Sequence, residues 1–161
     1  MPDRGIVFDQ EARAKLSAGV NLMGDIIGTT LGPQGRNVMF DRFGTPRVTN
    51  DGDLIAEQFA ESYGDEYLNV GLQIVREAAK KTGDSVGDGT TTAVVLTQAI
   101  AREGLRNIAA GANPMLMKRG LDQATTMAVD AIRELARPVS EAADIQRVAT
   151  IAANDAGIGA T

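Results

Sequence analysis

Apolar residues recur every three or four positions over most of this chain, so helices must supply most of its fold. The first such series consists of Ala12, Leu16, Val20, Met23 and Ile27. It predicts a helix over residues 9–28, and a second series of Leu68, Leu72, Val75 and Ala79 predicts one over residues 67–81. Further helices are expected over residues 53–60, 90–107, 114–135 and 141–153. The sequence therefore predicts a mainly α fold.

Three short segments depart from the helical pattern. Residues 37–41 and 47–49 are predicted to be two strands, joined by a loop with Phe43, Gly44 and Pro46, which makes a β-hairpin. Residues 4–8 are a further candidate strand. An isolated hairpin is marginally stable in water, so these strands are expected to find partners elsewhere. Residues 154–161 are expected to form no element.

The composition excludes several classes of chemistry. The 161 residues include no cysteine and no histidine, which excludes disulfides, thiol nucleophiles, Cys/His zinc sites and histidine bases. Any metal must be held by oxygen ligands, as Mg²⁺, Ca²⁺ and K⁺ are. The net charge of −5 argues against a nucleic-acid partner. No segment has the roughly 20 apolar residues of a membrane span, and charges interrupt the first 15 residues. We expect no membrane partner and a cytoplasmic location.

One motif combines glycines, a lone acid and three hydroxyls directly before a helix. It reads GDGTTT, over residues 87–92. Glycines let a backbone approach a ligand closely, and the start of a helix presents free N–H groups and the positive end of its dipole. The motif thus suggests a phosphate site, with Asp88 holding a cation against the phosphates. The alternative is that Asp88 or Thr90 simply caps the helix.

Two other glycine-containing segments occupy turns. TTLGPQGRN, over residues 29–37, joins the first helix to the first predicted strand. NDGD, over residues 50–53, ends the hairpin, and Asp51 stands where either a catalytic carboxylate or an ordinary turn residue is common. Each segment alone fits a structural turn. The sequence has neither a Walker A motif nor a GxGxxG fingerprint.

The order of these motifs resembles one family, the chaperonins, and within it the group I chaperonins of the GroEL type. The similar segments read TTLGPQGRNV, TPRVTNDG, GDGTTTAVVL and GLRNIAAGANPMLMKRG. The resemblance extends from about residue 5 to about residue 155. It implies that residues 1–137 form the N-terminal half of a multihelical equatorial ATPase domain, and that residues 138–161 begin the intermediate domain after a hinge at Pro138.

The resemblance also implies a site for ATP, Mg²⁺ and K⁺. The nucleotide-contacting residues by this resemblance are Thr30, Leu31, Gly32, Pro33, Asn50, Asp88, Gly89, Thr90, Thr91, Thr92 and Ile151. Among them Asp88 would hold Mg²⁺, the residues from Gly89 to Thr92 would bind phosphate, and Ile151 would lie near the base or ribose. K⁺ would be held by Thr30, Asn50 and Thr91. Asp51 would be the catalytic carboxylate that assists hydrolysis.

The resemblance further implies a ring of identical subunits, in which the hairpin of residues 37–49 pairs with a neighbour. Unfolded client proteins and a co-chaperonin would bind regions that lie outside this sequence, because members of the family are several times longer. Gln34 and Asn50 stand where group I members usually carry lysine, which removes two positive charges beside the nucleotide.

Three functions follow as hypotheses. The first is an ATP-dependent chaperonin subunit, and the second is a non-hydrolysing assembly module with weak or no nucleotide binding. The third is a plain helical oligomerisation domain whose glycine-rich turns have no chemical role. The retained GDGTTT motif favours the first, whereas Gln34, Asn50 and the length favour the second.

Overall fold

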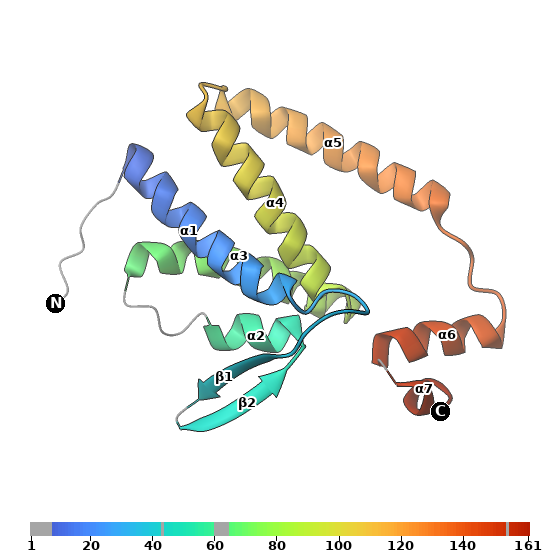
Figure 1. The fold of residues 1–161 in the computed structure, drawn as a ribbon. Helices are drawn as coiled ribbons and strands as arrows, with labels where there is room; N and C mark the ends of the chain where they lie inside the picture. Colours follow the sequence, from blue (N-terminus) through green and yellow to red (C-terminus); the bar gives the residue numbers. More distant parts are fainter. Residues whose placement is uncertain (1–7, 43, 60–64, 154) are drawn as a thin grey trace. The chain divides into compact units, whose positions relative to one another are not determined.

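The computed structural model describes residues 8–42, 44–59, 65–153 and 155–161 (Figure 1). Its elements in chain order are α1 (Asp9–Gly28), β1 (Val38–Arg42), β2 (Thr45–Thr49), α2 (Gly52–Phe59), α3 (Glu66–Val86), α4 (Thr90–Ala109), α5 (Pro114–Leu135), α6 (Ala142–Ala153) and α7 (Ala156–Gly159). They form two compact units, Met1–Ala112 and Asn113–Thr161. The boundary predicted between residues 137 and 138 from the family's domains is a different division and stays a prediction.

The helices begin and end close to where the sequence placed them. The largest difference is in α3, which continues to Val86, beyond its predicted end at residue 81. The expectation that residues 154–161 form no element is wrong, because α7 forms there with Asp155 as its N-cap. The Asp155 carboxylate accepts hydrogen bonds from the N–H groups of Gly157 at 2.7 Å and Ile158 at 3.0 Å. The strand predicted over residues 4–8 lies almost wholly outside the described residues.

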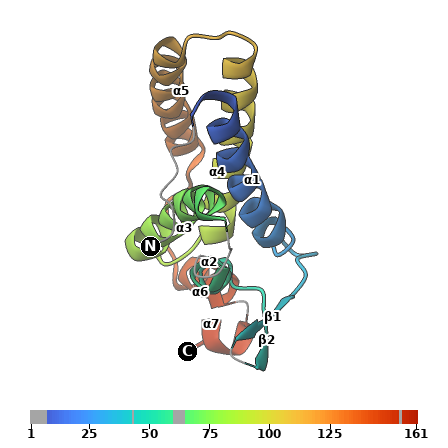
Figure 2. The same cartoon turned by 90° about the vertical axis from the view of Figure 1, so that its left-hand side faces the viewer.

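The predicted hairpin is confirmed as a two-stranded antiparallel sheet of β1 and β2 (Figures 1 and 2). Pro46 lies inside β2 rather than in the loop, opposite Asp41. Val38 and Phe40 of one face pack against the core. Cross-strand partners Met39 and Val48, on the other face, are 72% and 61% exposed. The described residues contribute no third strand to this sheet, so the apolar pair on its outer face is uncovered.

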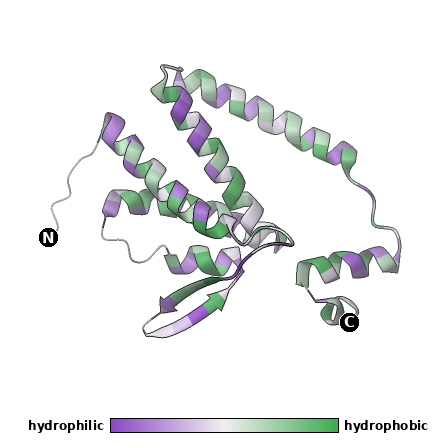
Figure 3. Cartoon of the chain, in the orientation of Figure 1, coloured by the Kyte–Doolittle hydropathy of each residue, from purple (hydrophilic) through white to green (hydrophobic). Residues whose placement is uncertain are grey.

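The unit of residues 113–161 contains α5, α6 and α7. Asn113 caps α5 through hydrogen bonds from the N–H groups of Met115 and Leu116, and Pro114 occupies the first turn. Hydrophobic and hydrophilic residues alternate along α5 (Figure 3), yet none of its residues is buried. The break around Pro138 is confirmed, because α5 ends at Leu135 and α6 begins at Ala142. No helix among the described residues is long and apolar enough to cross a membrane.

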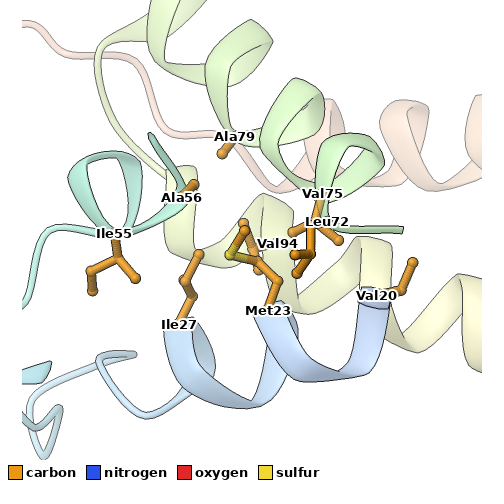
Figure 4. Close-up of a cluster of buried hydrophobic side chains, with 9 residues drawn as sticks. All are labelled: Val20, Met23, Ile27, Ile55, Ala56, Leu72, Val75, Ala79 and Val94. Atoms are coloured by element: carbon orange, nitrogen blue, oxygen red, sulfur yellow. The ribbon is translucent and has the colours of Figure 1, made fainter. Parts of the chain in front are cut away.

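The core lies in the unit of residues 1–112, where four helices bury apolar side chains against one another (Figure 4). Its members are Val20, Met23 and Ile27 of α1, Ile55 and Ala56 of α2, Leu72, Val75 and Ala79 of α3, and Val94 of α4. Most of them belong to the two apolar series read from the sequence. These helices support the segments that join them, which carry the three motifs.

A pair of glycines lets α1 and α3 approach very closely. A Cβ on Gly19 would lie 2.2 Å from the Leu68 carbonyl oxygen, and one on Gly71 would lie 2.4 Å from the Leu16 carbonyl oxygen. Both glycines are buried. Because backbone atoms cannot rotate away as side chains do, the two helices would have to separate to admit a methyl group.

We therefore expect Gly71→Ala to lower the free energy of unfolding by about 1–3 kcal/mol, the usual cost of overpacking. This loss would appear although alanine favours a helix over glycine by about 1 kcal/mol. Urea unfolding followed by circular dichroism measures it. Gly83→Ala is the matched control on α3, because its methyl group would meet the Thr90 Cγ2 at an ordinary 3.5 Å. Equal midpoints for the two variants would contradict the close crossing.

Asp65 caps the start of α3 and links it to α1. Its Oδ1 accepts hydrogen bonds from the N–H groups of Tyr67 at 2.9 Å and Leu68 at 3.4 Å. Its Oδ2 lies 3.4 Å from the Lys15 Nζ, which also stands 4.7 Å from the centroid of the Tyr67 ring. The Tyr67 N–H bond is the largest cause and lowers the pKa of the Asp65 carboxyl. Desolvation, the next largest, opposes it, and the Leu68 N–H bond and the Lys15 charge lower the pKa further.

A lowered pKa in the folded state means that the ionised Asp65 stabilises the fold above its ordinary pKa of 3.8. This stabilisation is lost as the pH falls below that value, through the folded-state pKa. Asp65→Asn keeps a good N-cap but removes the charge. We expect the parent protein to melt at a higher temperature than this variant at pH 7, and the difference to shrink as the pH falls below 3.8. A difference that does not change with pH would assign the effect to something other than the charge.

Candidate functional site

Two glycines make the turn between α3 and α4. Gly87 and Gly89 have φ angles of 74° and 79°, in the left-handed region where other residues are strained. The N–H of Gly87 closes α3 by donating to the Gly83 carbonyl at 2.8 Å. Asp88 stands exposed between the two glycines, and its Oδ1 accepts a hydrogen bond from the Gly89 N–H at 2.6 Å. The Gly-Asp-Gly spacing thus presents one carboxylate at the tip of a tight turn.

The first turn of α4 has no side-chain cap. Gly89 is the N-cap residue, and neither Asp88 nor Thr90 accepts a hydrogen bond from an N–H group of α4 itself. The alternative reading of the motif as a simple capping sequence is therefore wrong. The free N–H groups and the positive end of the dipole combine with the hydroxyls of Thr90, Thr91 and Thr92. This arrangement suits an anion such as a phosphate.

The loop after α1 is closed by its own backbone. The N–H of Arg36 donates to the Thr29 carbonyl at 2.8 Å, and that of Gly35 donates to the Gly32 carbonyl at 2.9 Å. Thr30 is buried, and its hydroxyl donates to the Ile27 carbonyl at 2.8 Å. The predicted nucleotide-contacting residues Leu31, Gly32 and Pro33 follow it and are exposed.

All three motifs meet at the side chain of Thr91. The hydroxyl oxygens of Thr91 and Thr30 are 3.4 Å apart, although 61 residues separate them in sequence. Gly52, of the NDGD segment, packs so closely that a Cβ there would lie 2.6 Å from the Thr91 Oγ1. The structure therefore brings the GPQG loop, the DG turn and the GDGTTT segment together, as the family resemblance implies.

Asp51 directly precedes α2 and caps its first turn. Its Oδ1 accepts a hydrogen bond from the Asp53 N–H at 2.9 Å, and its carbonyl accepts one from the Ile55 N–H at 3.0 Å. Its own N–H donates to the Thr49 hydroxyl at 3.1 Å. The side chain is exposed. Asp51 thus fits a capping role, which leaves its second carboxylate oxygen available for another partner. The sequence reading missed the cap, although an aspartate before the apolar pair Leu54 and Ile55 signals one.

Two further predicted nucleotide-contacting residues, Asn50 and Ile151, have exposed side chains. Asn50 directly precedes Asp51 and is exposed. Ile151 belongs to α6, in the unit of residues 113–161, and is 76% exposed. Its role beside a base or ribose stays a prediction.

The donor set can be compared with the cations that the resemblance implies. No three acidic side chains come together among the described residues in a way that could hold a metal. Asp88 offers a single hard carboxylate, and Mg²⁺ is commonly held by one or two carboxylates together with substrate phosphates. The neighbouring oxygens of Thr30 and Thr91 are neutral, which suits a weakly bound monovalent cation. The residues present therefore fit Mg²⁺ and K⁺, provided that a bound nucleotide supplies further oxygen ligands.

A shallow hollow of about 150 Å³ lies between α2 and α3. Its lining residues are Asp53, Glu57, Arg76, Lys80 and Asp84. Three carboxylates outnumber two cations there, so the hollow is a poor phosphate site. It contains none of the residues predicted to bind phosphate or metal.

Comparison with known proteins agrees with the fold and the motifs. The sequence matches the model of the TCP-1/cpn60 chaperonin family over residues 23–159. A solved structure described as a group III chaperonin in the open state is similar, with a TM-score of 0.76 and 31% sequence identity. That match covers 93% of this chain but only 30% of the other chain. These matches do not separate group I from the other groups, so the group I assignment stays a prediction. The mainly helical fold of this chain, with its short hairpin, matches that of the chaperonin equatorial domain. The chain belongs to the TCP-1/cpn60 chaperonin family.

Proposed function

We propose that this chain is the N-terminal part of an ATP-hydrolysing chaperonin subunit, which uses ATP to assist the folding of other proteins. The observation that carries the proposal is the meeting of three separated motifs at Thr91. A helix cap or a tight turn explains each motif alone, but neither needs the other two beside it. A phosphate site that also holds a carboxylate does need them together.

The residues of the chain would divide the work between binding and hydrolysis. The free N–H groups at the start of α4, with the hydroxyls of Thr90, Thr91 and Thr92, would donate hydrogen bonds to phosphate oxygens. The exposed loop of Leu31, Gly32 and Pro33 would contact the nucleotide. Asp51 would orient the attacking water through the carboxylate oxygen that does not cap α2, and accept its proton.

The two cations would be held by different groups. Asp88 would be the protein ligand of Mg²⁺, and Thr30, Asn50 and Thr91 would supply oxygens to K⁺. When bound, Mg²⁺ neutralises the charge that develops on the phosphates. Gln34 and Asn50 contribute no positive charge of their own, which leaves that neutralisation to the cations and to the N–H groups of α4.

We further propose that the hairpin contacts a neighbouring subunit of a ring, because the apolar pair Met39 and Val48 on its outer face is uncovered by the described residues. Clients and a co-chaperonin would bind parts of a longer subunit, in the cytoplasm. These parts would correspond to regions of the related chain outside the 30% that this chain spans.

Isothermal titration of the complete gene product with ADP and a non-hydrolysable ATP analogue, with and without Mg²⁺, tests the proposal. We expect saturable binding that Mg²⁺ strengthens, and ATP turnover by the assembled protein. Sedimentation of the same sample reports assembly independently. A protein that assembles into rings but neither binds nor hydrolyses ATP would instead support the second function, the non-hydrolysing assembly module.

A further inference from the structure

The backbone conformation at position 52 does not require the glycine that stands there. It is the first residue of α2, and its φ lies outside the left-handed region that favours glycine. Alanine is a better helix former than glycine, so local helix preference does not select glycine here. The reason must therefore be a contact.

That contact is with α4. A Cβ on Gly52 would lie 2.6 Å from the Thr91 Oγ1, 3.4 Å from the Thr91 Cα and 3.2 Å from the Ile27 Cγ2. Gly52 is buried, and Ile27 is fully buried in the core beneath it. The start of α2 thus rests directly on the first turn of α4, with no side chain between them.

The neighbours of this contact are the residues assigned to the reaction. Asp51 is bonded to Gly52 in the chain, and its carboxylate is fixed to the same turn by the Asp53 N–H. Thr91 lies in the first turn of α4, whose N–H groups would bind phosphate. The separation between the Asp51 carboxylate and these N–H groups is consequently set by how closely Gly52 can approach Thr91.

We propose that Gly52 is a positioning residue, whose missing side chain sets the distance between the Asp51 carboxylate and the phosphate-binding turn of α4. This inference rests on the proposed function. It distinguishes Gly52 from Gly87 and Gly89, which serve the backbone conformation of their turn. A methyl group at position 52 would push Asp51 away from the phosphate or turn the Thr91 hydroxyl aside.

The test is Gly52→Ala in the complete gene product, with kcat for ATP hydrolysis, the Kd for ADP and the Tm measured together. A displacement of about 1 Å at a reacting group lowers rates by about 100-fold, so we expect kcat to fall between about 10- and 100-fold. ADP affinity and Tm are expected to change little. Gly83→Ala is the matched control, because its methyl group would make an ordinary contact with Thr90, on the same turn of α4. It should keep the parent kcat.

A double variant separates positioning from a general loss of structure. Serine lacks the branching methyl of threonine and changes rotamer more freely, so Thr91→Ser should relieve the crowding. Gly52→Ala is then expected to lower kcat less in a Thr91→Ser background than in the parent, a departure from additivity. If Gly52→Ala does not fold, the double variant is expected to fold and to show the reduced kcat.

Several outcomes would overturn the inference. They are an unchanged kcat in Gly52→Ala, a loss of kcat matched by losses of Tm and ADP binding, strict additivity with Thr91→Ser, and a double variant that does not fold. Failure of the proposed function looks different, because then the parent protein itself neither binds nor hydrolyses ATP.

Discussion

Asp88→Asn is expected to lower kcat for ATP hydrolysis by about 100-fold or more in the complete gene product, and to remove the effect of Mg²⁺ on nucleotide binding. A metal ion supplies several kcal/mol of charge stabilisation to a phosphoryl transfer, and each 1.4 kcal/mol is about a tenfold change in rate. Asp88 is the one carboxylate on the Gly-Asp-Gly turn. Asparagine keeps the acceptor that the Gly89 N–H uses at 2.6 Å, so the turn itself should persist.

Asp84→Asn is the matched control for this experiment. Asp84 lies near the end of α3, is exposed, and lines the hollow that contains no predicted phosphate or metal residue. The same change of charge there should leave both turnover and its Mg²⁺ dependence near those of the parent. Turnover in Asp88→Asn that still responds to Mg²⁺ would show that another group holds the metal.

The helices could be predicted because their apolar spacing is a local signal that packing then uses. Val20, Met23 and Ile27 of α1 and Leu72 and Val75 of α3 fall at that spacing, and all five are buried. The short α7 could not be found in this way, because four residues contain no full period. Its one signal is Asp155, a good N-cap residue. Burial of Gly159 against Thr150 of α6, a tertiary contact, completes the turn.

In the candidate site too, some features follow from the local sequence and others from tertiary packing. The conformation of the Gly-Asp-Gly turn follows from glycine's tolerance of positive φ, a local property of the two residues. The approach of Thr30 to Thr91 spans 61 residues and follows from the packing of α1 against α4. No local rule predicts that approach; the resemblance to chaperonins implied it. Gly52 was read as part of a turn, because its tight contact with Thr91 depends on an element far along the chain.

The third hypothesis, a plain helical oligomerisation domain, explains the contacts least well. Such a domain needs caps for its helices, and α3, α5 and α7 have them in Asp65, Asn113 and Asp155. The helix α4 has three threonines in its first turn, yet no side chain caps its start. The missing side-chain cap alone is not distinctive, because α1 also begins without one. The first turn of α4 differs in lying beside the buried Thr30 and the close-packed Gly52, an arrangement that suits an external acceptor such as a phosphate.

Asp51→Asn separates catalysis from folding, because the observed capping role of Asp51 and its proposed catalytic role would fall to different atoms. Asparagine caps a helix about as well as aspartate, so the hydrogen bond from the Asp53 N–H to the side-chain oxygen should remain. The negative charge that would accept a proton from the attacking water is removed. General-base groups contribute about 10²- to 10⁴-fold to rates, so we expect kcat to fall within that range. ADP affinity and Tm should stay near those of the parent.

Asp51→Ala completes the comparison by removing the cap together with the carboxylate. Loss of an N-cap costs about 1 kcal/mol, so this variant should show the kcat of Asp51→Asn with a lower Tm. Single-turnover measurements with saturating ATP separate the chemical step from product release. Should Asp51→Asn keep the parent kcat while only Asp51→Ala loses activity, the cap would be the sole function of Asp51. The proton would then have to pass to another group, and Asp53, which shares the first turn of α2, would be the next residue to replace.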